Sequence, residues 1–137
     1  MEGMNPYPLR QLPGSDLRKA LESAVSEQPG GPAVVLSGIG SLIDAKLRFA
    51  GHHTATSIPG PSEILTLAGS LAENGAHLHM SISTPDGRVI GGHVVYGNTV
   101  RTTAEVLLAP LPGWVLQREP YASTGYDELV VRRRVEE

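Results

Sequence analysis

Alternation of polar and apolar residues is clearest in the middle of the chain. Between His77 and Ser83 the odd positions are polar and the even positions apolar, which is the period of a β-strand with one buried face. Several other segments are rich in strand-forming residues and are bounded by Gly, Pro or Asn. The strands predicted from them cover 33–37, 42–50, 63–68, 88–96, 100–109 and 126–135, with a shorter one at 114–116.

A helical period occurs once, near the N-terminus. Apolar residues at 17, 20, 21, 24 and 25 share one face, so we expect a helix over 16–28 with Ser15 as its N-cap. Gly38-Ile39-Gly40 is expected to end the first long strand, and 52–61 to form a polar connection. Because strands dominate and short turns join consecutive ones, an α+β fold is predicted, a mainly antiparallel sheet flanked by one or two helices.

The length of the chain fits one domain. We assign residues 1–137 to it, with 1–12 as an N-terminal extension. Cysteine is absent, which excludes disulfides, thiolate metal sites and a cysteine nucleophile, and fits the reducing cytoplasm where we expect the protein. Neither a signal peptide nor a membrane span is predicted, because 1–9 lacks a basic start and no run of about 18 apolar residues occurs.

The charge balance argues against direct binding of nucleic acid. The chain has 11 Lys and Arg against 14 Asp and Glu, a formal net charge of −3. Proteins that bind nucleic acid usually carry a basic footprint that neutralises phosphates. The basic cluster at 132–134 is followed by two glutamates, and its side chains alternate between faces if the segment is a strand. We therefore interpret it as a solvated edge.

Two histidines of the alternating strand project to the same side. Side chains two residues apart on a strand share a face, so His77 and His79 lie together, followed by Ser81 and Ser83. The alternative is that both merely occupy the polar face of a half-exposed strand. His52 and His53 point opposite ways if extended and are interpreted as surface residues.

The turn after this strand decides whether His93 joins the pair. Thr84-Pro85-Asp86-Gly87 suits a type I turn followed by a left-handed glycine, a three-residue loop that pairs Thr84 with Arg88. In an antiparallel pair, the residue numbers of opposed residues have a constant sum, which is 172 for Thr84 and Arg88. The numbers 79 and 93 have the same sum, so His79 and His93 become cross-strand partners. A two-residue loop, or a bulge at Gly91-Gly92, would instead turn His93 to the opposite face.

Three neutral imidazoles with one open position form a zinc site of the catalytic type. His77, His79 and His93 are therefore the predicted metal ligands, with Zn²⁺ as the expected metal. Glu63 and Glu105 are the carboxylates expected near them, as a fourth ligand or as acceptors that fix an imidazole tautomer. Arg48 and Arg101 are candidates for binding a small anion beside the site. Neither a P-loop nor a nucleophile elbow is present.

A series of motifs spans nearly the whole chain and resembles the PPC domain family, the plant and prokaryote domain found beside AT-hooks. The motifs are Pro13-Gly14-Ser15-Asp16-Leu17, Gly38-Ile39-Gly40-Ser41-Leu42, Ala45-x-x-Arg48, Glu63-Ile64-Leu65-Thr66-Leu67-x-Gly69, His77-Leu78-His79-x-Ser81, Asp86-Gly87-x-x-x-Gly91-Gly92-His93, Thr102-Thr103-Ala104-Glu105-Val106 and Thr124-Gly125-Tyr126-Asp127-Glu128-Leu129. The resemblance implies a strongly twisted sheet and a homotrimer. The fold is also similar to that of acetolactate decarboxylase, whose three histidine ligands correspond to His77, His79 and His93.

Two functions follow from these expectations. The first is a trimeric binding or regulatory module with a three-histidine metal site, which contacts a protein partner or small anionic ligand and is DNA-associated as its plant relatives are. It lacks an Arg-Gly-Arg-Pro hook for the minor groove. The alternative is a zinc-dependent lyase or hydrolase acting on a small carboxylate. Glu63 or Glu105 would then move protons and Arg48 would bind the anion.

Overall fold

A computed structural model describes residues 5–135 of the chain. Strands make up most of it, and one α-helix, α1 (Leu17–Glu27), lies between the first two. The eight strands are β1 (Tyr7–Gln11), β2 (Ala33–Arg48), β3 (Thr56–Ala72), β4 (Gly75–Ser83), β5 (Val89–Val94), β6 (Thr99–Pro110), β7 (Trp114–Tyr121) and β8 (Tyr126–Arg133).

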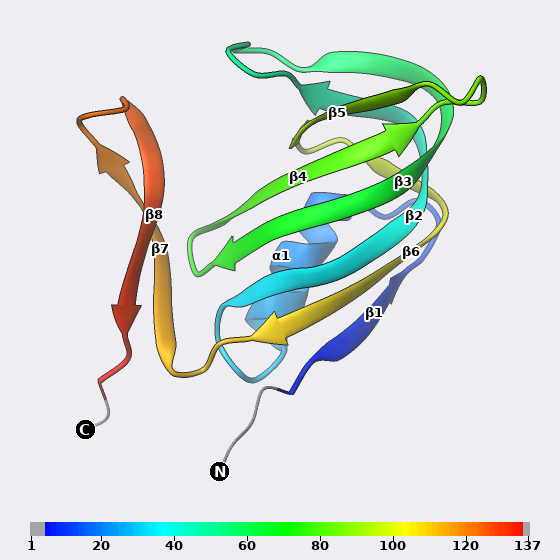
Figure 1. The fold of residues 1–137 in the computed structure, drawn as a ribbon. Coiled ribbons are helices and arrows are strands. Elements are labelled where there is room, and N and C mark those ends of the chain that lie inside the picture. The colour runs from blue at the N-terminus through cyan, green and yellow to red at the C-terminus, as the bar shows by residue number, and fades with distance from the viewer. Residues whose placement is uncertain (1–4, 136–137) are drawn as a thin grey trace.

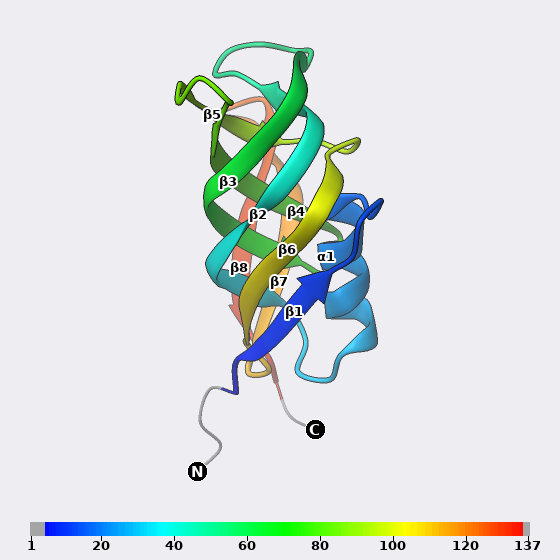
Figure 2. The ribbon, with the colours of Figure 1, turned by 90° about the vertical axis from the view of Figure 1, so that its right-hand side faces the viewer.

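Six of these strands form one strongly twisted antiparallel sheet in the order β1-β6-β2-β3-β4-β5 (Figure 1). The end of β2 also pairs with β5, so the sheet curls back on itself. Helix α1 packs against one side of the curled sheet, while β7 and β8 form a separate hairpin beside the β3–β4 turn (Figures 1 and 2). The predicted α+β fold with a mainly antiparallel sheet is confirmed, and within residues 5–135 it has one helix.

The core lies between α1 and the curled sheet. Leu17 and Leu21, one helical turn apart, are completely buried, and the helix packs against β3, β4 and β6. The helix begins one residue later than predicted, because Asp16 rather than Ser15 caps it by accepting a hydrogen bond from the Lys19 amide at 3.0 Å. This packing fixes the helix on the side of the sheet toward which Leu78 and Ile82 of β4 point.

The prediction that Gly38-Ile39-Gly40 ends a strand is wrong. The segments 33–37 and 42–50 belong to a single strand, β2, which runs between β3 and β6. A β-carbon on Gly40 would lie 2.7 Å from the Cα of Ala104, and one on Gly38 would lie 3.0 Å from the side chain of Leu67. These glycines therefore allow close interstrand approach instead of stopping the strand.

Other predicted elements were too short. The strand predicted at 63–68 extends over the whole of β3 and takes in part of the polar connection, and the short strand at 114–116 is the eight-residue β7. Tyr7–Gln11, inside the segment assigned as an N-terminal extension, pair with β6 as β1. Within residues 5–135, no helix combines the length and hydrophobicity that crossing a membrane requires.

Candidate metal centre

His77 and His79 lie on β4, and the strand's alternation determines which way they face. Leu78 and Met80 are buried in the core, so the odd-numbered side chains point to the opposite side of the sheet. His77 is half-buried there and His79 is exposed. The prediction that both project from one face of a strand is confirmed.

The turn between β4 and β5 sets the position of the third histidine. The Thr84 amide donates to the Arg88 carbonyl at 2.9 Å, the Gly87 amide donates to the Thr84 carbonyl at 2.8 Å, and Gly87 has φ +84°. This is the predicted three-residue loop with a left-handed glycine. The register runs without a shift from Ser83 opposite Val89 to His79 opposite His93, which excludes the alternatives of a two-residue loop or a bulge at Gly91-Gly92.

Gly92 allows β2 to approach β5 beside the three histidines. A β-carbon at this position would lie 2.9 Å from the carbonyl oxygen of Arg48, so its absence lets the end of β2 pair with β5. Arg48 is then the cross-strand partner of His93, and paired residues of antiparallel strands present their side chains on the same face. Arg48 therefore lies beside the histidines, where an arginine that binds an anion is expected.

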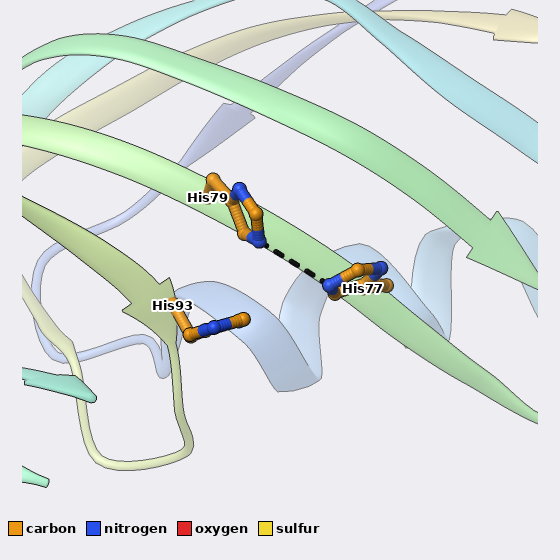
Figure 3. Close-up of side chains that lie close together, drawn as sticks. All are labelled: His77, His79 and His93. Atoms are coloured by element: carbon orange, nitrogen blue, oxygen red, sulfur yellow. Dashed lines mark hydrogen bonds between the residues drawn. The ribbon is translucent and has the colours of Figure 1, made fainter. Parts of the chain in front are cut away.

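The three imidazoles converge (Figure 3). Each offers one ring nitrogen, and these nitrogens all lie within 4.8 Å of one another. The Nε2 atoms of His77 and His79 are 3.2 Å apart, and the ring centroids of His79 and His93 are 4.5 Å apart. Tetrahedral zinc with Zn–N bonds of about 2.0–2.1 Å requires nitrogens roughly 3.3 Å apart. The donor set therefore fits a divalent metal after small side-chain rotations.

The surroundings of two of the rings favour the neutral form of the imidazole. Burial, followed by the positive charge of Arg118, lowers the pKa of His77 below its usual value of 6.5. Burial and then Arg48 lower the pKa of His93 in the same direction. A neutral imidazole has a free lone pair, which is the form that binds a metal ion.

A cavity of about 470 Å³ adjoins the histidines, and His77 and His93 form part of its wall. Arg48 from β2, Arg18 from α1 and Arg118 from β7 also line it, as do Asp127 and Glu128 from β8. The β7–β8 hairpin thus contributes charged groups of both signs to the side of the cavity near His77. The arrangement suits a polar ligand carrying negative charge.

The structure does not bring the two expected carboxylates to the histidines. Glu63 lies on β3 opposite Ser83, at the other end of β4 from His77, and its side chain is exposed. Glu105 lies on β6 between Arg10 of β1 and Ile39 of β2. Neither lines the cavity, and the same holds for Arg101 on β6. His52 and His53 are exposed in the connection between β2 and β3, as predicted.

Sequence reasoning missed the groups that the hairpin and the helix contribute. Glu128, rather than Glu63 or Glu105, is close enough to His77 to affect its pKa, and it raises that pKa slightly against the larger effects that lower it. Arg118 and Arg18 are absent from the predicted set as well. The motif at 124–129, which contains Glu128, was the one sequence signal that pointed to this part of the chain.

Comparison with known proteins places this chain in a family. Residues 1–112 match the Plants and Prokaryotes Conserved (PCC) domain. The chain belongs to this family. It is the family named PPC above, so the resemblance is confirmed. The Bifunctional protein GlmU of Synechococcus sp. (strain JA-3-3Ab) is 42% identical over 130 residues, which are 95% of this chain and 21% of that protein. The chain thus spans about a fifth of the length of that relative.

Two solved structures and a plant relative add detail about the PCC family. A hypothetical protein from Salmonella shares 38% identity and a TM-score of 0.92, with 98% of each chain covered. A metal-containing protein from Archaeoglobus fulgidus shares 25% identity and a TM-score of 0.81, over 95% of this chain and 99% of that one. AT-hook motif nuclear-localized protein 8 of Arabidopsis thaliana is 32% identical over 74% of this chain and 28% of its own length.

Proposed function

We propose that this PCC domain is a metal-binding module in which His77, His79 and His93 hold one zinc ion. The observation that carries the proposal is the convergence of three imidazole nitrogens within 4.8 Å. The metal-containing relative from A. fulgidus supports it. Bound zinc would leave a coordination position open, at which it acts as a Lewis acid toward a ligand.

We also propose that a small anion occupies the cavity beside this metal. Arg48 donates to the carbonyl of His52 at 3.2 Å, and Arg118 donates to the carbonyl of Asp127 at 2.7 Å. Neither guanidinium forms a salt bridge with a carboxylate among residues 5–135. These two cations without an ionic partner, Arg118 near His77 and Arg48 near His93, favour a ligand such as a carboxylate or phosphate.

Self-association into a trimer is proposed as the state in which the module works. The resemblance implies it, and exposed apolar side chains on the sheet are consistent with it. Leu36 and Ile39 on β2 and Leu65 on β3 are each more than two-fifths exposed, at 47%, 52% and 44%. Light scattering coupled to size exclusion should give three times the chain mass, and a monomer would contradict the proposal.

Association with DNA is a second candidate function, favoured by the similarity to the plant AT-hook protein. The net charge of −3 makes direct phosphate binding unfavourable, so we propose that any such role proceeds through a protein partner. Gel shifts on unrelated DNA at low salt should show no complex with the isolated chain. The alternative of a zinc-dependent lyase or hydrolase has less support, because Glu63 and Glu105 lie away from the histidines.

Metal analysis of the purified chain tests the metal proposal. About one zinc per chain is expected by mass spectrometry, and His79→Ala should lose it. His53→Ala is the matched control, because His53 is exposed and lies outside the three-histidine cluster. Equal zinc content in His79→Ala and the wild type, or no zinc uptake by the wild type, would overturn the proposal.

A further inference from the structure

Near the three histidines, the backbone of β4 stops pairing with β5 and bonds to side chains of α1. The β4–β5 ladder ends at the pair His79 and His93. Beyond it, the two polar backbone groups of Ala76 bond to side chains of α1 instead. The Ala76 carbonyl accepts from Nη2 of Arg18 at 3.1 Å, and the Ala76 amide donates to Oε2 of Glu22 at 3.0 Å.

Arg18 also reaches the other strand. Its Nη1 atom donates to the carbonyl of Val94 at 3.3 Å. Ala76 immediately precedes His77, and Val94 immediately follows His93. One guanidinium therefore links the residues beside two of the three metal ligands, at the end of the sheet where no ladder hydrogen bond holds the strands together.

The helix presents Arg18 and Glu22 in a fixed arrangement. They are four residues apart on α1, and their side chains form an ion pair at 3.4 Å with only about a quarter of each exposed, 24% and 25%. The Tyr96 hydroxyl donates to Oε1 of Glu22 at 2.7 Å, and the Arg18 guanidinium lies over the Tyr96 ring, 4.4 Å from its centroid. These contacts with Tyr96 hold the side chains of Arg18 and Glu22 in the conformations that bond to Ala76.

We infer that Arg18 and Glu22 are positioning residues for the metal centre, an inference that rests on the proposed binding of zinc by the three histidines. The pair takes the place of a β5 partner for Ala76, which is paired on its other side with Leu71 of β3, and fixes the separation between the ends of β4 and β5. The ligands are then ordered before the metal arrives, so binding does not have to offset the entropy of ordering them. Substitution of Arg18 or Glu22 leaves the other contacts of α1 intact, because Leu17 and Leu21 are fully buried and Asp16 caps the helix.

Cobalt(II) binding to the full chain tests the inference, because the visible spectrum of the bound ion reports the number and geometry of its ligands. In Arg18→Met the affinity for Co²⁺ should fall on the order of tenfold, the size typical of groups that orient metal ligands. The absorbance of the bound ion should also weaken, as water replaces a displaced imidazole. Arg18→Lys retains the positive charge on a single donor nitrogen, in place of the two nitrogens that Arg18 uses, and should recover part of the affinity.

Arg132→Met is the matched control, because it removes an Arg–Glu ion pair of 3.0 Å on the β7–β8 hairpin. It should bind Co²⁺ as the wild type does. If Arg18→Met does not fold by circular dichroism, Glu22→Ala replaces it and should lower the affinity several-fold. Wild-type affinity and spectrum in the folded variant would overturn the inference and leave the zinc proposal intact. Failure of the wild type to bind Co²⁺ would overturn both.

Discussion

Gly69 on β3 packs directly against the main-chain carbonyl of His77 on β4. The two strands are in register with Gly69 opposite Leu78, and Gly69 has φ +138°. A β-carbon there would overlap the carbonyl oxygen of His77 and approach the Cα of Leu78 to 2.9 Å. The position of a proposed metal ligand thus depends on a missing side chain in the neighbouring strand.

Gly69→Ala should therefore damage both the fold and the metal site. Strained backbone and the steric clash together should lower the free energy of unfolding by at least about 2 kcal/mol. Because β4 must move at His77, zinc affinity should fall as well. Denaturant unfolding and a zinc competition titration measure the two effects.

Gly60→Ala provides the control for this substitution. Gly60 has φ +88°, but a β-carbon added there would have no neighbouring atom within 4 Å, so only the backbone cost of about 1–2 kcal/mol applies. Its zinc affinity should match the wild type. Equal losses in the two variants would show that contact with His77 is unimportant.

The stability of the metal-free protein should depend on pH through His77 and His93. Folding lowers both pKa values from 6.5, chiefly by burial, so below about pH 6.5 the unfolded chain binds more protons than the folded one. The free energy of unfolding should then decrease as the pH falls from 6.5 through the lowered pKa values and level off above about pH 7.5. Urea unfolding at several pH values measures this.

Replacing both histidines by glutamine provides the comparison for the pH experiment. The double variant should lose much of the pH dependence between about 5 and 6.5, because glutamine does not titrate. A slope unchanged by the double substitution would contradict the assignment and would attribute the acid sensitivity to other groups.

Asn98 should be a strong determinant of stability. It is completely buried, accepts from the Lys46 amide at 2.8 Å, and donates to the carbonyls of Lys46 and Val95 at 2.9 and 3.0 Å. Asn98→Ala removes these three part-buried hydrogen bonds and leaves a cavity where the buried side chain was, so the free energy of unfolding should fall by about 2–4 kcal/mol. Thermal or denaturant unfolding tests the prediction.

Asn74→Ala is a useful comparison, because Asn74 also bonds both backbone groups of one strand residue. It accepts from the Arg118 amide at 2.7 Å and donates to the Arg118 carbonyl at 2.9 Å, but it is exposed. Water can replace it there, so the loss should stay below about 1 kcal/mol. A loss as large as that of Asn98→Ala would show that burial does not explain the difference.

Arg48 and Arg118 should control anion binding by the zinc-loaded protein. Inorganic phosphate is a suitable probe, and its affinity should fall about three- to tenfold in Arg48→Met and in Arg118→Met, because each loses one charge-assisted contact. Arg101→Met should have no effect, since Arg101 is exposed on β6 and does not line the cavity. Calorimetric titration at constant ionic strength measures the affinities, and equal values in all three variants would contradict the proposal.

The local geometry of the three histidines was predictable from sequence because it depends on one hairpin. A strict alternation set the common face of His77 and His79, and the turn residues 84–87 set the register that brought in His93. Each inference needed only a short stretch of chain. Arg48 was also expected beside the histidines, although the pairing of β2 with β5 that explains its position was not foreseen.

Groups brought in from distant elements were not predictable in the same way. Glu128 and Arg118 reach the cavity because the β7–β8 hairpin is anchored at the β3–β4 turn, where Asn74 bonds to Arg118. Neither the hydrophobic periodicity nor the spacing of residues within a short segment predicts that contact. Gly38 and Gly40 show a related difficulty, since a glycine that ends a strand and one that admits a close neighbour look alike in a sequence.

Strand β5 is held from both sides, by β4 through the pair His79 and His93 and by β2 through the pair Arg48 and His93. Slippage of β5 along one neighbour would also break its hydrogen bonds with the other. The position of the third imidazole thus depends on two ladders as well as on the turn at 84–87, so a change of register would also have to break the pairing with β2.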